Sequence, residues 1–255
     1  MPERKMFVRF LHDGRWRYGL LAQKGVTPLK GSIFSGWERS GRPLPLARVR
    51  LGPPCRPGKI VAVGVNYRGH AREMGHDLPE DPKIFLKPGT AVIGPGEDIR
   101  YPSMASRVDY EAELAVVVGR RCRNVPKEEA MDHILGCTCF NDVTARDLQK
   151  KDGQWARAKS FDTFAPLGPA IVTGIDPSDL VVESWLNGRR KQSSSTADLI
   201  FSVPELVSFI SRVMTLLPGD VIATGTPAGI GPMVPGDRIE VRVGGVGSLL
   251  NRVVR

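Results

Sequence analysis

The sequence predicts a β-rich α+β fold with only a few helices. Its 28 glycines and 21 prolines are spread along the chain and separate many short apolar segments, a pattern typical of strands joined by turns. Segments with helical periodicity are few. Strands and helices do not alternate as they do in Rossmann or TIM-barrel chains, so neither of those folds is expected.

Nine short apolar segments are candidate strands because they are rich in β-branched and aromatic residues. They span residues 6–11, 16–22, 59–65, 83–88, 111–119, 169–174, 180–188, 220–226 and 237–245. Pro-Gly-Asp turns stand at the start of the last two, which supports a strand after each turn.

Two segments predict helices. Residues 203–217 follow Ser202, which forms a capping box with Glu205, and they carry an apolar stripe at helical spacing. The stripe consists of Leu206, Val207, Ile210, Val213, Met214 and Leu217. A second helix is expected over residues 127–135, stopped by Gly136.

A proline-rich connector suggests a domain boundary. Residues 42–59 contain five prolines and two glycines. We therefore predict a small β-rich domain over residues 1–55 and a catalytic domain over residues 56–255.

Composition limits the function classes. The net charge is +9, but basic residues are scattered, aromatic residues make up 7% and no zinc-finger or RNP-type pattern occurs, so no nucleic-acid partner is expected. No apolar run approaches the roughly 18 residues of a membrane span, and no secretory signal is evident. Four cysteines without a CxxC pair predict reduced thiols and a cytoplasmic location.

The segment VDYEAELAVVVG places Asp109, Glu111 and Glu113 at alternate positions of a predicted strand, hence on one face. Neighbours on that face lie roughly 7 Å apart, where two charges repel by about 2 kcal/mol at an effective dielectric near 20. Solvent removes this cost, and a bound cation reverses it. Asp142 in CFNDVTARDLQ supplies a third carboxylate, with Asp147 as the alternative. Such a set suits Mg²⁺ or Mn²⁺, with Ca²⁺ as a further alternative.

His70 and Glu73 lie three residues apart in a predicted helical turn, so a carboxylate can orient the imidazole as a general base. The alternative is an exposed loop pair. A zinc site from His70, Glu73 and His76 is a geometrically poorer alternative.

Lys159 lies between a polar loop and an apolar run, where it can stabilise an enolate oxygen or a carboxylate or simply be a surface lysine.

The Gly-rich segment 223–232 follows a strand. Its N–H groups and the hydroxyls of Thr224 and Thr226 can bind an anion; the alternative is a purely structural turn.

Six segments in this order resemble the fumarylacetoacetate hydrolase family, from about Lys59 to the C-terminus. They are VGVNYRGHAREMG, IFLKPGTAVIGPG, VDYEAELAVVVG, CFNDVTARDLQ, AKSFDTFAPLGP and LPGDVIATGTPAGIGP. The founding fumarylacetoacetases have a further Asp shortly before the His, which VGVNYRGH lacks, so the chain is more similar to the smaller prokaryotic members. The resemblance implies a mixed β-sheet roll or distorted barrel, a divalent metal and a homodimer.

The resemblance also assigns site residues. The implied metal ligands are Glu111, Glu113 and Asp142; the implied catalytic residues are His70, Glu73 and Lys159; the implied substrate-binding residues are Arg146, Gln149 and Thr226. It gives Asp109 no ligand role, so we expect Asp109 at the rim.

The implied chemistry is that of a metal-dependent enzyme acting on a 2-oxo acid or its enol. The chain is most similar to 2-hydroxyhepta-2,4-diene-1,7-dioate isomerases. Hydrolysis of an acylpyruvate or fumarylpyruvate, and decarboxylation or tautomerisation of oxaloacetate, are the alternatives. A net charge of +9 fits a di- or tricarboxylate substrate. The alternative from another class is a basic anion-binding protein without catalytic activity.

Overall fold

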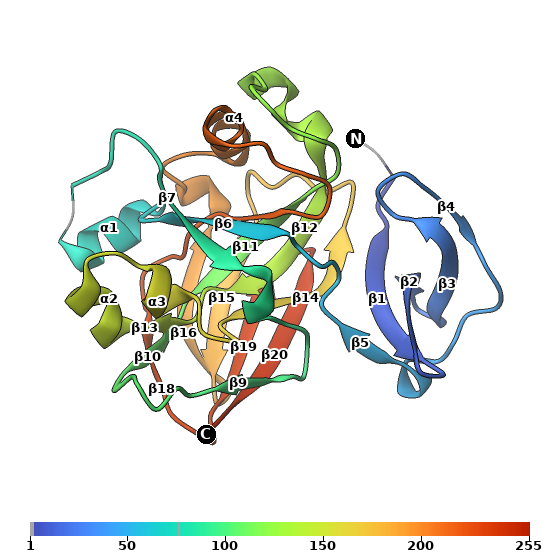
Figure 1. Ribbon diagram of the computed structural model, residues 1–255, viewed down its shortest axis with the longest axis horizontal. Helices are drawn as coiled ribbons and strands as arrows, with labels where there is room; N and C mark the ends of the chain where they lie inside the picture. Colours follow the sequence, from blue (N-terminus) through green and yellow to red (C-terminus); the bar gives the residue numbers. More distant parts are fainter. Residues whose placement is uncertain (1–2, 76) are drawn as a thin grey trace.

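The computed structural model describes residues 3–75 and 77–255 and contains three β-sheets with a few short helices (Figure 1). The predicted β-rich α+β class is confirmed. Within the described residues no sheet closes into a barrel, so the architecture is that of packed open sheets.

The large sheet has 12 strands and runs β4-β3-β2-β1-β14-β12-β11-β17-β6-β7, with β5 paired to β1 and β8 paired to β14. Its strands are β1 (Met6–His12), β2 (Arg15–Ala22), β3 (Gly25–Ser32), β4 (Gly36–Arg39), β5 (Arg50–Gly52), β6 (Lys59–Gly64), β7 (Lys83–Pro88), β8 (Val92–Ile93), β11 (Ala112–Val118), β12 (Ile134–Asn141), β14 (Ala165–Val172) and β17 (Val221–Ala223).

Two smaller sheets complete the fold. A five-stranded sheet has the order β16 (Arg189–Ser195), β15 (Val181–Leu186), β19 (Arg238–Val243), β20 (Gly247–Val254) and β9 (Asp98–Arg100). A three-stranded sheet has the order β13 (Thr144–Ala145), β10 (Val108–Tyr110) and β18 (Gly231–Met233).

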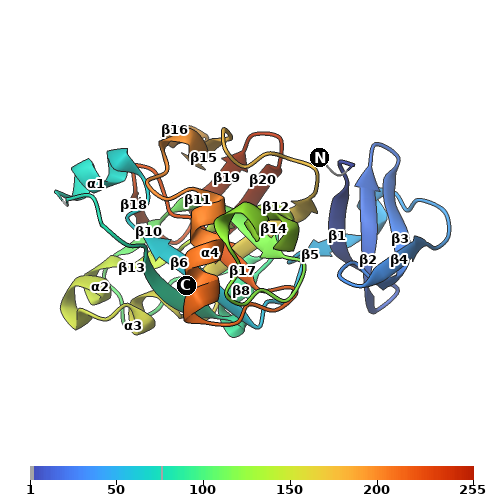
Figure 2. The same ribbon diagram turned by 90° about the horizontal axis from the view of Figure 1, so that it is seen from above.

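The α-helices are α1 (Arg68–Met74), α2 (Arg146–Asp152), α3 (Ala156–Lys159) and α4 (Val203–Val213). The 3₁₀ helices are η1 (Leu46–Arg48), η2 (Gly89–Ala91), η3 (Lys127–His133) and η4 (Thr196–Asp198). In both ribbon views α1, α2 and α3 gather at the end of the molecule opposite strands β1 to β4 (Figures 1 and 2). None of the described helices is long and apolar enough to cross a membrane.

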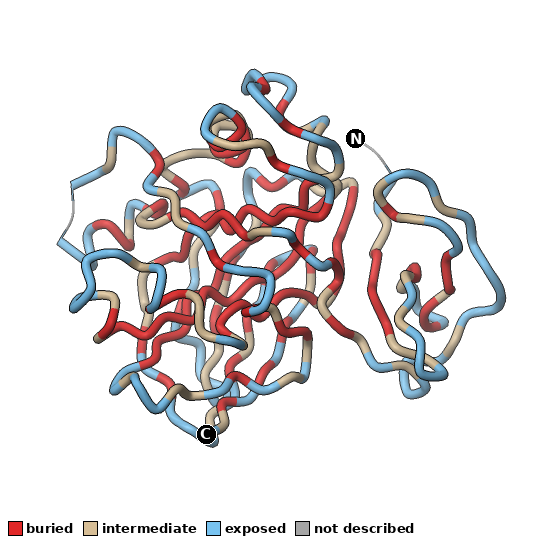
Figure 3. Tube along the Cα trace, viewed as in Figure 1, coloured by how far each residue is buried: buried red, intermediate tan, exposed pale blue. Residues whose placement is uncertain are grey.

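Strand β11 lies at the centre of the core and is buried along its whole length. Leu114 and Val116 pack in a cluster with α4 and the five-stranded sheet, whereas Ala115 and Val117 pack in a second cluster on the opposite face. Buried residues, drawn red, dominate this region (Figure 3). The side chains of β11 therefore alternate between its two faces, and Glu113 lies on the same face as Ala115 and Val117.

All nine predicted strands exist, with ends shifted by up to four residues. Helix α4 begins where predicted, and the carboxylate of Glu205 accepts hydrogen bonds from the backbone N–H (2.8 Å) and hydroxyl (2.6 Å) of Ser202. It ends at Val213 rather than at residue 217 because the chain turns to pair Leu216 with Cys122 through two backbone hydrogen bonds of 2.9 Å. Val213 and Leu217, which the stripe predicts in the core, are 53% and 50% exposed.

The predicted helix at residues 127–135 is a 3₁₀ helix that ends at His133. Strand β12 then begins at Ile134, because pairing with Val118 of β11 takes these residues into the sheet. Long-range pairing thus replaced the last turn expected from local sequence.

The small sheet region formed by β1 to β5 stands at one end of the molecule (Figures 1 and 2). It joins the rest of the large sheet where Met6 and Phe7 of β1 pair with Val172 and Ile171 of β14. The division at residues 55 and 56 stays a prediction.

Candidate metal and catalytic site

A cavity of about 190 Å³ at the helical end of the molecule contains all the predicted site residues except Glu73 among its lining residues. Strands β6, β7 and β11 and helices α1, α2 and α3 contribute to its wall. This is smaller than the roughly 300 Å³ and more of drug-sized ligand sites, so the cavity suits a small substrate.

The three predicted metal ligands converge here. Carboxylate oxygens of Glu111, Glu113 and Asp142 lie within 4.8 Å of one another, and all three residues are buried. Glu111 stands in the break between β10 and β11, and its carbonyl accepts a 2.9 Å hydrogen bond from the N–H of Asp142, the residue after β12. The side-chain oxygen of Asn141 accepts a 3.0 Å hydrogen bond from the Glu111 N–H, which holds Glu111 next to the end of β12. The solvated alternative for the acidic face is therefore wrong.

The carboxylates differ in charge environment. Burial raises the pKa of Glu113 well above its usual value, and the neighbouring Asp142 and Glu111 charges add to this effect. Burial also acts against ionisation of Glu111, but the positive charges of Lys159 and Arg146 outweigh it and lower its pKa. Glu113 therefore holds its charge less readily than Glu111.

Lys159, at the end of α3, is 2% exposed and donates to Glu111 (3.0 Å) and to Asp142 (2.6 Å). Burial by itself would lower the pKa of Lys159, but the carboxylates of Asp142 and Glu111 raise it, so the ammonium form is held. The surface-lysine alternative is thus wrong. Lys87 of β7 is completely buried and donates to the other Asp142 oxygen at 2.5 Å.

Arg146 and Gln149 come from α2 and form a hydrogen bond with each other. Arg146 also donates to Glu111 and, at 2.9 Å, to Asp109. Asp109 is 0% exposed, so the expectation that it lies at the rim is wrong. It is buried because Arg146 and Arg107 both pair with its carboxylate, which makes Asp109 the anchor of Arg146.

His70 and Glu73 pair as predicted. His70 Nδ1 lies 2.9 Å from Glu73 Oε2, and His70 is 6% exposed, so the exposed-loop alternative is wrong. This contact leaves Nε2 as the ring nitrogen that can serve the cavity. The other Glu73 oxygen accepts from the Gly229 N–H at 2.9 Å, which ties α1 to the Gly-rich loop. His76, of the alternative zinc site, lies outside the described residues.

The Gly-rich loop binds a carboxylate of the protein itself. The Gly225 N–H donates to Glu113 at 2.9 Å, and the Thr224 hydroxyl donates to the Leu114 carbonyl at 2.9 Å. Thr226 donates to the Ala112 carbonyl at 2.9 Å and accepts from Gln192 at 2.8 Å. The only hydroxyl proton of Thr226 is thereby used, so toward a substrate it can only accept.

The donor set fits a hard divalent cation. Basic side chains bind Glu111 and Asp142 but, within the described residues, not Glu113, so the negative charge of the cluster is only partly compensated. Oxygen-only ligands are those that Mg²⁺ and Mn²⁺ prefer. Asp147 does not belong to this set, because its carboxylate accepts from the N–H (2.9 Å) and hydroxyl (2.8 Å) of Ser106.

Sequence reasoning passed over Lys87 and Asp109 as functional residues. Both stand in segments that resemble the family, but Lys87 lies next to the end of its predicted strand, where a lysine is usually exposed. A charged residue inside an apolar strand was the available signal, since such residues are rarely buried unless paired.

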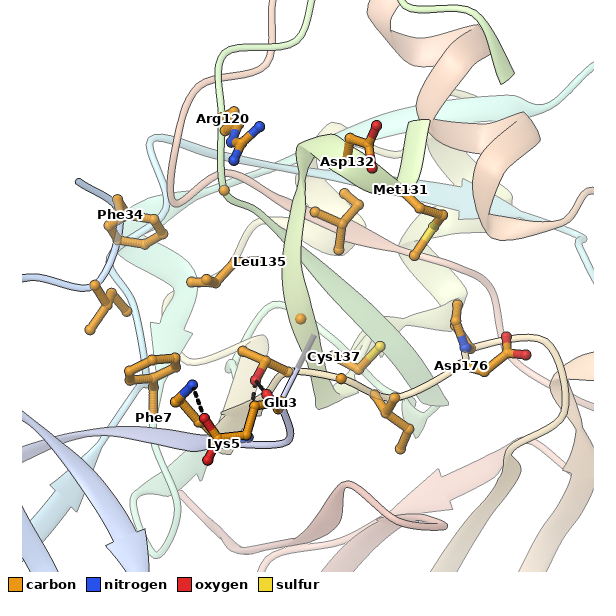
Figure 4. A pocket seen from close by; sticks show the side chains of 18 of the residues that line it. Glu3, Lys5, Phe7, Phe34, Arg120, Met131, Asp132, Leu135, Cys137 and Asp176 are labelled. Atoms are coloured by element: carbon orange, nitrogen blue, oxygen red, sulfur yellow. Dashed lines mark hydrogen bonds and ion pairs between the residues drawn. The ribbon is translucent and has the colours of Figure 1, made fainter. Parts of the chain in front are cut away.

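A larger cavity, of about 840 Å³, lies between the β1 region and the start of β12. Figure 4 shows apolar side chains such as Phe7, Phe34 and Leu135 around it, with the Lys5–Glu3 ion pair on one side and Arg120 on another. The carboxylate cluster is elsewhere, so size alone would have selected the wrong place for chemistry.

Comparisons with known proteins give the family. The family model "Fumarylacetoacetate (FAA) hydrolase C-terminal" matches residues 59–254, and an "Rv2993c-like, N-terminal" model matches residues 6–54. A 2-hydroxyhepta-2,4-diene-1,7-dioate isomerase structure from Mycobacterium marinum is 45% identical, with 98% of each chain covered and a TM-score of 0.92. The oxaloacetate tautomerase YisK of Bacillus subtilis is 44% identical over 82% of this chain and 74% of its own.

A fumarylpyruvate hydrolase from Pseudomonas aeruginosa, solved with Mn²⁺ and pyruvate, is 36% identical over 80% of this chain and 91% of its own, with a TM-score of 0.74. These relatives are an isomerase, a tautomerase and a hydrolase, and one of them binds a divalent metal. The chain belongs to the fumarylacetoacetate hydrolase family of enzymes.

Proposed function

We propose that the protein is a divalent-metal-dependent isomerase or tautomerase that moves a proton between the keto and enol forms of a small 2-oxo acid. One observation carries the proposal: a buried three-carboxylate cluster, a His–Glu pair and a buried lysine share one cavity of about 190 Å³. The names of the M. marinum isomerase and the B. subtilis tautomerase support the same reaction class.

Glu111, Glu113 and Asp142 would hold the cation, Mg²⁺ or Mn²⁺. When bound, the cation supplies positive charge that stabilises an enolate of a 2-oxo acid. Lys159 contributes a second, permanently placed positive charge at the same end of the cavity.

Each remaining residue has a role set by its contacts. His70 Nε2 exchanges the substrate proton while Glu73 fixes the other ring nitrogen. Arg146, held by Asp109, and Gln149 orient a substrate carboxylate. Trp155 and Phe85, whose rings meet edge to face at 5.2 Å, form an apolar wall that limits access of water.

The test is an ultraviolet assay with Mg²⁺ on oxaloacetate, hydroxydiene-dioates and acylpyruvates, with products identified. Glu111→Gln is expected to lower metal-dependent turnover about 100-fold or more because it removes a charged ligand and leaves the fold intact. The matched control is Glu129→Gln, an exposed position. Wild-type turnover in Glu111→Gln would show that the carboxylate cluster is not the metal site.

A second candidate is C–C bond hydrolysis of an acylpyruvate or fumarylpyruvate. The favouring observation is the His70–Glu73 contact of 2.9 Å, the arrangement of a general base that activates water.

His70→Ala separates the two candidates. We expect it to stop water-dependent cleavage completely, while a measurable rate of tautomerisation survives because an enolate can take its proton from solvent. Chromatographic analysis of the products from both substrates measures the two rates. Equal loss of both reactions would mean that solvent does not replace His70 in tautomerisation and that both reactions need its imidazole alike.

A further inference from the structure

Four basic side chains line the cavity, and three of them are already paired with carboxylates. Lys159 binds Glu111 and Asp142, Arg146 binds Asp109 and Glu111, and His70 binds Glu73. These cations neutralise acids of the protein, so only part of their charge is left for a substrate.

Lys150 is different. It lines the same cavity and is exposed, and among residues 3–75 and 77–255 it has no hydrogen-bond or ion-pair partner for its ammonium group. It is therefore the one basic group on the cavity wall whose charge no acid of the described chain compensates.

Helix geometry gives Lys150 its direction. Lys150 stands four residues after Arg146 on α2, so these two side chains share a helix face. Gln149 directly precedes Lys150. Exposure rises along that face, from buried Arg146 through half-buried Gln149 to exposed Lys150. The cavity thus runs from the carboxylate cluster and Lys159 at its buried end to Lys150 at its mouth.

We infer that Lys150 binds the distal carboxylate of the substrate and makes the enzyme selective for 2-oxo dicarboxylates over 2-oxo monocarboxylates. This inference rests on the proposed function for the placement of the 2-oxo acid group at the buried end. With the 2-oxo acid group at the buried end, the second carboxylate of such a substrate is directed toward the α2 mouth, where Lys150 lines the same cavity.

The test uses a matched pair of ligands, 2-oxoglutarate and 2-oxopentanoate, which have the same chain length and differ only in the terminal carboxylate. Calorimetric titration with Mg²⁺ measures both dissociation constants for the full-length protein. We expect the wild type to prefer 2-oxoglutarate by about five- to tenfold, as for a partly exposed charge contact. Lys150→Met should bring the ratio of the two constants to about one, and Lys150→Arg should restore it.

Lys151→Met is the matched control, since it removes the same charge from the next residue of α2, which does not line the cavity. It should keep the preference. The inference is overturned if the wild type does not discriminate, if Lys150→Met still discriminates, or if Lys151→Met abolishes the preference equally. Turnover is scored separately: if discrimination holds but no 2-oxo acid is converted, the proposed function fails and the role of Lys150 stands.

Discussion

At the residue scale, the three carboxylates of the cluster are not equivalent. Glu111 and Asp142 are each bound by two or more basic groups, whereas within the described chain Glu113 accepts a single hydrogen bond, from the Gly225 N–H. Its charge is the least compensated of the three, which explains why burial and its neighbours raise its pKa. A divalent cation would compensate this charge, so metal binding is expected to keep Glu113 ionised.

Glu113→Gln should therefore stabilise the protein when chelator removes metal. A carboxyl whose pKa is higher in the folded than in the unfolded chain costs nothing below the unfolded value, about 4.3, where both states are protonated. The penalty grows as pH rises above that value and is complete above the folded pKa. At pH 8 we expect the variant to be more stable by about 1–2 kcal/mol, which raises Tm by about 2–6 °C.

Differential scanning fluorimetry with EDTA at pH 8 and pH 4 measures this, with Glu129→Gln as the exposed control. The gain should disappear at pH 4. Added Mg²⁺ should stabilise the wild type more than Glu113→Gln, since the variant lacks one ligand. A variant that is less stable than the wild type at pH 8 with EDTA would contradict the assignment of an uncompensated charge.

At the element scale, local patterns predicted nine strands that exist, such as β6, β7 and β11, because alternation and β-branched content mark them. They missed other strands, such as β3 and β16, whose Gly-rich or polar sequences carry no such pattern, and also β12 and β20. The helix ends were predictable only where local capping decides them, as at Ser202. Where sheet pairing competes, as at Ile134, it outweighs local preference because several backbone hydrogen bonds and a buried face are gained together.

The site was predictable from the sequence only through the order of its motifs. The burial of both faces of β11 and of Asp109 depends on partners distant in sequence, such as Arg146 for Asp109. The turn from β6 into α1 shows the same limit. Val65 lines the cavity and has a positive φ of 56°, which is rare for a β-branched residue. The side-chain amide of the next residue, Asn66, donates to the carbonyls of Phe201 and Thr224. No local sequence pattern predicts this positive φ.

At the scale of the whole molecule, the charge is distributed unevenly. Residues 1–55 hold 11 Lys and Arg against 3 Asp and Glu, and residues 56–255 hold 25 against 24. The part that carries the site is therefore nearly neutral, and the net charge of +9 says little about the substrate. Selectivity for an anionic substrate has to come from individual side chains at the cavity, Lys150 among them.

The two parts of the chain should nevertheless unfold together. Phe7, Leu20, Leu29 and Ile33 of the first 55 residues belong to one buried cluster with Ile60 and Ile171. Exposing four such side chains costs about 6–12 kcal/mol, which is comparable to the whole stability of a typical domain of about 5–15 kcal/mol. The β1–β14 pairing and the hydrogen bonds of Thr173 to Glu3 and Lys5 add to this coupling.

The four tryptophans can report on this, since Trp16 and Trp37 stand in the first part and Trp155 and Trp185 in the second. A Trp155→Phe/Trp185→Phe variant reports only on residues 1–55, and a Trp16→Phe/Trp37→Phe variant only on the rest. For each variant, the urea midpoint from fluorescence is compared with the midpoint from far-ultraviolet circular dichroism of the same variant. We expect the two midpoints to agree in both variants. A fluorescence midpoint clearly below the dichroism midpoint in the first variant alone would mean that residues 1–55 unfold separately, as the predicted boundary at residue 55 would then allow.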